Sequence, residues 1–586
     1  MKFDSFYSEE SIIKILCKYR ASAAKKRHDR HMMRNISLHE SSNKIEVTAK
    51  QDEFIFLQSI FPSRRKWTKL NQRERKSCNG SGEINKQRLF KSYNDIRWRI
   101  HNEGLAPPLW YNDLLAFVSE ISDEINNVES SGYKFEPPII KGLKKEIKKG
   151  IIIYRPIAKY ALKEKIISTV TAKYFTVFFD KIFLDCSYAF RSKNIANIVP
   201  NHHQCIEKIL DHRKANKLLW VSECDIQKFF DTVQHEHTLI KFKQGAAQIE
   251  LDFGEIVDKR AVVIFNLFLL SFSFQENILN LNNNPQWFLD NNLEPGEFSW
   301  VESELNTQFG NSYVASYAIG IPQGNAISCF IANLILHDVD TKIIKQHPEI
   351  FYIRYCDDMI LMSSDENTCK DVLDIYMNGI KDNFLLFHNP KQIENYKVAE
   401  NSRKFWKLKS KLPFLWDDKN LGSKNIPWVS FVGYQVNFNG IIRVRKATIK
   451  KEVKKQTAES EKILRFLGKV NHYSKPKNEH SRLSKKQIVF SLHNRLIAMS
   501  VGRVKLHNHK NPSKQGMCWT NGFRILSHNK ISSKQLRYLD KTRNIQVNRI
   551  KNEVKHINKT ARTTFDDSNK IFLGCAFSYY NFLKHK

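Results

Sequence analysis

The chain lacks several features that would place it among membrane, secreted or zinc-binding proteins. No stretch reaches the roughly 18 consecutive apolar residues that a membrane span needs. The opening sequence, MKFDSFYSEESIIK, lacks the basic and then apolar pattern of a secretory signal. None of the ten cysteines forms a C-x-x-C pair, so a zinc site built on paired thiolates is not expected. We therefore expect a globular, cytoplasmic protein with reduced cysteines and no membrane partner.

Acidic residues are scarce relative to basic ones. The chain has 94 Lys plus Arg against 60 Asp plus Glu, for a formal net charge of +34. Residues 441–586 alone hold 34 Lys and Arg against 8 Asp and Glu, so this quarter carries most of the excess. Such a charge attracts polyanions and favours the release of counterions from phosphates. It indicates nucleic acid as a partner, although a basic, solvated surface would give the same composition.

Length and composition indicate several domains. A chain of 586 residues that is 41% hydrophobic and 12% aromatic can form two to four cores. Residues 1–108 mix helical periodicity with basic runs and predict a basic helical extension. Residues 109–440 alternate strand-like and helical segments and hold most of the carboxylates, with a loop-like insertion at about 276–310. Residues 441–586 space their apolar residues as helices do, notably at 461–470, 487–499 and 535–550.

Three short elements in the middle segment carry the chemistry. The first is Asp225, which ends a strand-like run and is followed by two aromatic residues. The second is a Gly/Pro loop at 318–328 that leads into a helix. The third is the pair Asp357 and Asp358, which lies between two apolar runs. Alone, these could be a helix cap, an ordinary turn and a hairpin turn. Adjacent carboxylates raise each other's pKa unless a cation lies between them. In proteins, a bound divalent metal ion usually compensates the negative charge of such a pair.

In this order, the three elements resemble the palm motifs A, B and C of reverse transcriptases. Upstream, YRPIAKYALKEKIIS and CSYAFRSKN resemble fingers motifs of the bacterial enzymes, and downstream WVSFVGYQVNFNGIIRVRK resembles the junction of palm and thumb. The resemblance covers about residues 154–446. It implies an α+β right-hand polymerase, with fingers, a palm built on an antiparallel sheet and a helical thumb, extended by helical segments at both ends.

The resemblance also implies a reaction and its cofactor. The expected activity is RNA-directed DNA polymerisation from dNTPs by two Mg²⁺ ions, with Mn²⁺ as an alternative. Asp225, Asp357 and Asp358 would be the catalytic residues and metal ligands, helped by the backbone carbonyl of Ile226. Expected partners are an RNA template and the DNA product.

Phe230 indicates which sugar is used. RNA-dependent RNA polymerases typically carry an Asp here that accepts a hydrogen bond from the ribose 2′-hydroxyl, and a bulky ring would clash with that hydroxyl and leave it unpaired. Deoxynucleotides are therefore expected, unless Phe230 is simply a core residue. By resemblance, further nucleotide-binding candidates lie in the palm and the fingers: Gln323, Gly324, Tyr355, Arg155, Lys165 and Arg191. Lys391 is the candidate general acid, although its surroundings depart from the usual Lys-Thr pattern.

Among bacterial reverse transcriptases, the chain resembles the defence-associated or abortive-infection group most. Paired cysteines of a C-terminal endonuclease are missing, as are the carboxylates of an RNase H or an integrase, and retron enzymes are usually shorter. The resemblance to this group implies that the protein confers resistance to phage by making DNA, either from a dedicated non-coding RNA or without a template. It also implies, as an expected partner, further copies of the chain or an accessory protein. The alternatives are a retron or group II intron-type enzyme of a mobile element, and a catalytically silent nucleic-acid-binding scaffold. All the expected carboxylates are present, which argues against the scaffold.

Overall fold

The computed structural model describes residues 2–36, 49–78, 81–192, 199–392, 394–471, 526 and 530–560. The chain forms two compact units. The first consists of Met1–Ile12, Phe117–Val432 and Val436–Gly440, and the second of Ile13–Ala116, Gly433–Gln435 and Ile441–Lys586. The α+β class expected from the sequence is confirmed, and the palm sheet lies in the first unit.

The palm is an antiparallel sheet with β3 at its centre. β3 pairs with β6 on one side and with β7 and β8 on the other, and β5 lies at the edge beyond β6. The strands are β3 (Trp220–Gln227), β5 (Phe351–Tyr355), β6 (Asp358–Ser363), β7 (Leu386–Phe387) and β8 (Lys411–Leu415). In β3, Cys224 and Ile226 are buried while Asp225 is only half-buried, because successive side chains of a strand point to opposite faces.

Helices cover the buried face of the palm sheet and continue into a phenylalanine-rich core. α16 (Glu366–Asp382) packs on β3, β6 and β8, and α15 (Ala326–Gln346) packs on α16, α6 and α9. In the core, the ring of Phe175 lies 5.0 Å from that of Phe330 and 5.3 Å from that of Phe242. α6 spans Leu162–Phe179 and α9 spans His235–Phe253. This unit also contains η1 (Phe3–Ser5), α7 (His202–Ala215), α8 (Phe229–Thr232), α10 (Lys259–Leu270), α14 (Tyr313–Ser316) and α17 (Ala399–Phe405).

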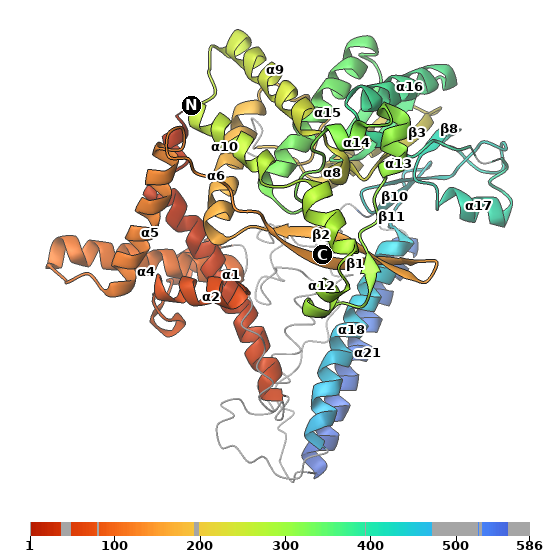
Figure 1. The fold of residues 1–586 in the computed structure, drawn as a ribbon. Helices are drawn as coiled ribbons and strands as arrows, with labels where there is room; N and C mark the ends of the chain where they lie inside the picture. Colours follow the sequence, from red (N-terminus) through yellow and green to blue (C-terminus); the bar gives the residue numbers. More distant parts are fainter. Residues whose placement is uncertain are drawn as a thin grey trace. The chain divides into compact units, whose positions relative to one another are not determined.

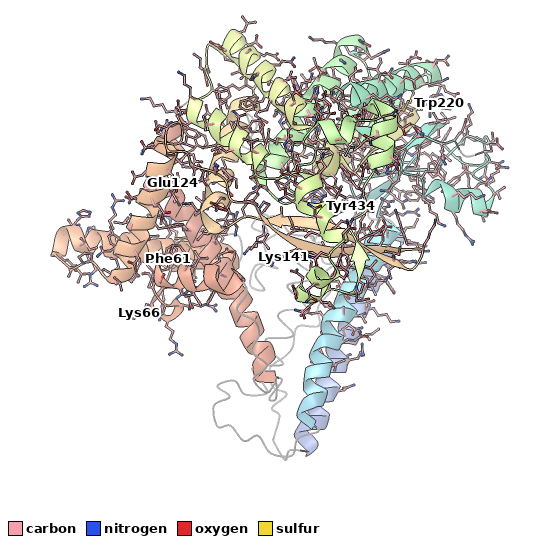
Figure 2. All side chains as sticks on the ribbon, viewed as in Figure 1. Phe61, Lys66, Glu124, Lys141, Trp220 and Tyr434 are labelled. Atoms are coloured by element: carbon pink, nitrogen blue, oxygen red, sulfur yellow. The ribbon has the colours of Figure 1, made fainter. Side chains whose placement is uncertain are left out.

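A long hairpin precedes the palm, formed by β1 (Ile139–Lys148) and β2 (Ile151–Lys159). Figure 2 labels Lys141 in β1 and Trp220 at the start of β3. Residues 276–310, expected to be loop-like, are instead largely helical and pack on this hairpin. Tyr154 of β2 lies in one apolar cluster with Phe288 and Phe298, which holds the segment in place. Its elements are η3 (Gln275–Leu279), α11 (Asn280–Asn282), α12 (Pro285–Asp290), β4 (Gly296–Glu297) and α13 (Glu302–Phe309).

One helical run among the described residues is long and apolar enough to cross a membrane by length and composition. It covers Lys259–Asn282, and half of its most apolar window is buried. Phe265 and Phe268 are both fully buried within it, and the ring of Phe265 lies 4.4 Å from that of Phe242. Core helices of soluble proteins have the same composition, and this packing accounts for the apolar character of the run.

The described parts of the second unit are mainly helical, as expected for both extensions, apart from short strand segments between residues 433 and 444. At the C-terminal end, α18 (Lys446–Asn471) and α21 (Lys530–Thr560) lie side by side (Figure 1). They confirm the helices expected at 461–470 and 535–550, whereas 487–499 lies outside the described residues. The N-terminal helices are α1 (Glu9–Ile36), α2 (Ala49–Ser59), η2 (Arg64–Lys66), α3 (Gln72–Ser77), α4 (Ser81–Glu103) and α5 (Leu109–Asn126), the first and last of which cross the unit boundaries. The strands β9 (Trp428–Phe431), β10 (Tyr434–Asn437) and β11 (Ile442–Val444) precede α18 in sequence.

Candidate active site

The sheet register brings the three aspartates together. Asp225, near the end of β3, is the direct cross-strand partner of Asp358, the first residue of β6. Asp358 also pairs with Tyr355, so Cys356 and Asp357 form the two-residue turn of the β5–β6 hairpin. Cys356 has a φ of 61°, the left-handed conformation that such tight hairpin turns favour. All three carboxylates therefore lie at one end of the palm sheet.

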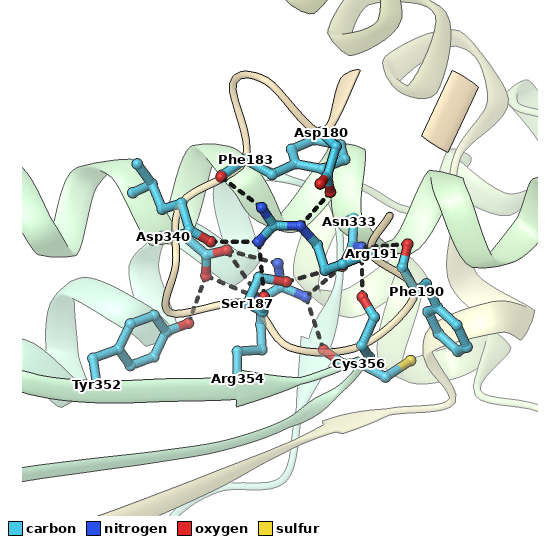
Figure 3. A network of polar contacts seen from close by, with 12 residues as sticks. Asp180, Phe183, Ser187, Phe190, Arg191, Asn333, Asp340, Tyr352, Arg354 and Cys356 are labelled. Carbon is cyan, nitrogen blue, oxygen red and sulfur yellow. Dashed lines mark hydrogen bonds and ion pairs between the residues drawn. The ribbon is translucent and has the colours of Figure 1, made fainter. Parts of the chain in front are cut away.

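A buried ion pair lies next to this turn and is drawn in Figure 3. Arg354 and Asp340 have side chains that are each only 1% exposed, and the guanidinium donates to the Asp340 carboxylate at 2.6 Å. Arg354 also donates to the carbonyl of Cys356 at 3.1 Å, and Tyr352 donates to Asp340 at 2.8 Å. Although burial opposes its charge, the attraction of Asp340 raises the pKa of Arg354. Arg354 therefore holds the backbone of the turn that carries Asp357.

The carboxylates at the end of the sheet repel one another. Loss of surrounding water, reinforced by the negative charges of Asp357 and Asp225, raises the pKa of Asp358 to about 7. Loss of water also raises the pKa of Asp357, and the charge of Asp225 adds to this. Lys409 acts in the opposite direction on both pKa values. Its Nζ lies 3.0 Å from Oδ2 of Asp225.

The donor set fits a divalent cation in chemistry and in position. Carboxylate oxygens are the ligands that Mg²⁺ prefers, and the register places three of them on adjacent backbone positions. Across the described ranges, no three His, Cys, Asp or Glu side chains already converge as a metal cluster. Asp225 would have to exchange its contact with Lys409 for one with the ion.

The Gly/Pro loop connects the palm to the fingers hairpin. Phe230 is half-buried, its ring lies 5.2 Å from that of Phe229, and its carbonyl accepts a hydrogen bond from the Ile321 amide at 2.8 Å. Gln323 donates to the buried carboxylate of Asp231 at 2.6 Å. These bonds fix the loop beside Phe230, and the nucleotide-binding roles of Phe230 and Gln323 stay predictions. Gly324 is exposed in this loop with a φ of +96°, which glycine adopts without strain.

Basic residues of the β1–β2 hairpin lie near the same site. Arg155 is exposed on β2, as a triphosphate ligand must be, and the exposed Lys145 and Lys148 lie on β1. Burial lowers the pKa of Lys228, and the three hairpin charges lower it further. Sequence reasoning missed Lys145 and Lys148, although the basic run KGLKKEIKKG at 141–150 was a usable signal.

Arg191, predicted to bind the triphosphate, has a different role in the structure. Its side chain is 8% exposed, and its guanidinium pairs with Asp180 and donates to the carbonyls of Phe183, Leu184 and Ser187. All three of its nitrogens thus bond to the protein, which corrects the prediction. Its contacts tie the loop after α6 to the network of Figure 3.

The other candidates are Tyr355, Lys165 and Lys391. Tyr355 is half-buried at the end of β5, opposite Asp358, and Lys165 is half-buried on α6. Lys391 is exposed, and its amide donates to the carbonyl of Ser410. The Ser410 hydroxyl accepts from the amide of Asp225 at 2.9 Å, so two hydrogen bonds to Ser410 link the backbone of Lys391 to that of a predicted metal ligand.

One comparison with known protein families covers part of the segment that carries this site. The family described as "Reverse transcriptase (RNA-dependent DNA polymerase)" matches residues 286–404. The match includes the loop at 318–328 and the pair Asp357 and Asp358, whereas Asp225 lies before it. No curated protein matches the chain.

Solved structures similar to the chain include telomerases of two yeasts. Apo telomerase of Candida tropicalis, truncated from its C-terminal domain, shows 14% identity and a TM-score of 0.31 over 61% of this chain and 68% of that one. Telomerase of Candida albicans with a TWJ fragment of telomeric RNA shows 12% identity and a TM-score of 0.30 over 92% of this chain and 85% of that one. Telomerase of Candida tropicalis with a TWJ fragment of telomeric RNA shows 11% identity and a TM-score of 0.35 over 94% of this chain and 78% of that one. The family match over residues 286–404 indicates an RNA-directed DNA polymerase.

Proposed function

We propose that this polymerase is a bacterial, cytoplasmic enzyme of phage defence. It makes DNA from dNTPs at the site formed by Asp225, Asp357 and Asp358, either from a dedicated non-coding RNA or without a template. The observation that carries the catalytic part is the register of β3 and β6, which sets Asp225 directly opposite Asp358. The defence role rests on the resemblance of the sequence to that group.

In this proposal, Asp225 and Asp357 hold two Mg²⁺ ions, with Asp358 adjacent and the Ile226 carbonyl assisting. Bound there, the ions would lower the pKa of the primer 3′-hydroxyl and neutralise the leaving pyrophosphate. The protein's own contribution is positional. Arg354 fixes the turn between β5 and β6, because it donates to the carbonyl of Cys356.

The nucleotide would lie between the palm and the fingers hairpin. Phe230 would exclude a 2′-hydroxyl, and Gln323, held by Asp231, would shape the floor beneath the template base. Arg155 and Lys148 would face the triphosphate, since both are exposed basic residues of the β1–β2 hairpin whose charges act on Lys228 beside the palm. Removing either cation should weaken dNTP binding more than it slows the chemical step.

The start of α18 supports an RNA partner. Arg445 precedes the helix, and Lys446, Lys450, Lys451 and Lys454 are exposed on its first turns. The first turn has no acidic residue, and Glu452 on the second turn is buried. Cations at a helix N-terminus oppose the helix dipole, which favours anions there. A phosphate backbone would satisfy both the dipole and the lysines. Homo-oligomers or an accessory protein remain compatible with this arrangement.

A nucleotide incorporation assay on the purified full chain tests the proposal. Mg²⁺ and each dNTP are supplied, with and without RNase pretreatment, and the co-purified nucleic acid is sequenced. Enrichment of one non-coding RNA with RNase-sensitive synthesis supports a dedicated template, and RNase-resistant synthesis supports untemplated polymerisation. Intron or retron RNA instead would indicate an enzyme of a mobile element. No incorporation at all would indicate the silent scaffold.

Phage plating tests the defence role separately. Phage should form few plaques on cells that express the wild-type chain. On cells that express Asp357→Asn, phage should form as many plaques as on cells without the gene. Equal protection by both proteins would contradict a defence role based on DNA synthesis.

A further inference from the structure

Two lysines approach the palm carboxylates from one segment. Lys409 lies just before β8, and its Nζ is 3.0 Å from Oδ2 of Asp225. Lys411 is the first residue of β8, pairs in register with Glu223 of β3 and forms an ion pair with its carboxylate. The two carboxylates are two residues apart on β3, as are the two lysines on their own segment. Residues at this spacing share a face of a strand, so the ion pairs form a short ladder.

The two ion pairs differ in burial. The side chains of Lys411 and Glu223 are 5% and 13% exposed, which makes this pair part of the fold. The side chain of Lys409 is 66% exposed, although that of Asp225 is only 19% exposed. A lysine whose side chain is largely exposed can leave its partner at a small cost in free energy. Water hydrates the released ammonium group, and the side chain regains conformational entropy. Lys409 can therefore detach from Asp225, whereas Lys411 is fixed.

The backbone keeps Lys409 within reach of Asp225. The Asp225 amide donates to the hydroxyl of Ser410, the neighbour of Lys409, at 2.9 Å. On the same side of β3, the Asp225 carbonyl accepts from the amide of His388 at 3.0 Å. The segment that carries Lys409 is thus tied to the main chain of Asp225. When the side chain detaches, it stays close enough to return.

We propose that Lys409 competes with the divalent cation for Asp225 and so sets the cation concentration at which the active site fills. The inference rests on the proposed metal site. Oδ2 of Asp225 cannot contact the lysine ammonium and a divalent ion at once without bringing two positive charges together. Filling the site therefore requires Lys409 to move into solvent. Because the pair is exposed, the competition should change apparent metal affinity about two- to fivefold.

Lys404 provides a matched control. Its side chain is 63% exposed, and its Nζ lies 2.9 Å from the carboxylate of Glu400, so residue type, exposure and pair distance all match Lys409. The pair lies within α17, outside the strands of the palm sheet. Lys404→Met removes the same charge from the protein as Lys409→Met, but not from Asp225. Lys409→Arg keeps the charge at Asp225.

The experiment is a Mn²⁺ titration of the full chain without nucleotide or nucleic acid, in which electron paramagnetic resonance measures free Mn²⁺. Lys409→Met should bind Mn²⁺ about two- to fivefold more tightly than wild type. Lys409→Arg and Lys404→Met should both bind within about 1.5-fold of wild type. Asp225→Asn should bind much more weakly, which establishes that the titration reports this site.

The outcomes separate the inference from the proposed function. If Asp225→Asn weakens binding while Lys409→Met leaves it unchanged or weakens it, the metal site stands and competition by Lys409 is refuted. If Lys409→Arg or Lys404→Met binds as tightly as Lys409→Met, the effect does not come from a cation at Asp225, which also refutes it. If Asp225→Asn binds Mn²⁺ like wild type, the proposed metal site itself fails, and the inference fails with it.

Discussion

Arg354→Met tests how the catalytic turn is held. The substitution leaves the Asp340 carboxylate, 1% exposed, without its cation and removes the bond to the Cys356 carbonyl. Breaking a buried ion pair by removing one partner costs about 3–5 kcal/mol. This range already includes the lost hydrogen bonds. We expect the free energy of unfolding of the first unit, which contains the palm sheet, to fall by that amount. Primer extension should slow by at least about tenfold, which corresponds to about 1.4 kcal/mol in the activation barrier.

A double variant separates stability from positioning. Arg354→Met with Asp340→Leu removes both charges, and replacing a buried pair by apolar residues is often nearly neutral. Tyr352 and Cys356 still lose their partners, and an unsatisfied buried polar group costs about 1–3 kcal/mol. The double variant should therefore regain part of the stability that the single variant loses. Its extension rate should stay low, because nothing holds the Cys356 carbonyl.

Urea unfolding followed by tryptophan fluorescence, together with primer extension at saturating dNTP, measures both effects. Lys404→Met, at an exposed pair, is the control and should change stability by less than about 1 kcal/mol. A double variant as unstable as Arg354→Met would show that the uncompensated charge of Asp340 is not the cause. A wild-type extension rate in either Arg354 variant would refute the positioning role.

Two further predictions concern the nucleotide site and the loop beside it. Phe230→Ala should raise ribonucleotide incorporation relative to deoxyribonucleotide at least about tenfold in kcat/KM, because an unhindered 2′-hydroxyl fits, and an unchanged ratio would make Phe230 a plain core residue. Gly320 and Gly324 share a φ of +96°, but only at Gly320 would a Cβ meet Phe274, at 2.8 Å. Gly324→Ala should therefore cost about 1–2 kcal/mol of stability and Gly320→Ala at least about 1 kcal/mol more, as urea unfolding would measure; equal losses would contradict the packing argument.

The palm was predictable because its signals are local. Asp225, Asp357 and Asp358 each sit at the end of an apolar run, and the runs have strand composition, so the strands and the carboxylates could be inferred together. The α+β class follows from the same alternation. The register that pairs Asp225 with Asp358 is what the structure adds to these local patterns.

Features that depend on distant contacts could not be predicted in the same way. Lys409 reaches Asp225 only because residues nearly two hundred positions apart pair in one sheet, and nothing near Lys409 in the sequence indicates this. Arg191 lies in a motif typical of the fingers, yet Asp180 and backbone carbonyls take up its guanidinium. Residues 276–310 have loop composition, but packing of Phe288 against Tyr154 overrides local propensity.

The central claim is that the paired aspartates of the β5–β6 turn carry out DNA synthesis. The most direct test is primer extension with Mg²⁺ and dNTPs by Asp357→Asn with Asp358→Asn, alongside circular dichroism and nucleic-acid binding of the same protein. The amides keep the size of the carboxylates but not their charge, so extension should be lost while fold and nucleic-acid binding stay close to wild type. If the folded double variant still extends a primer, the assignment of the catalytic site is wrong.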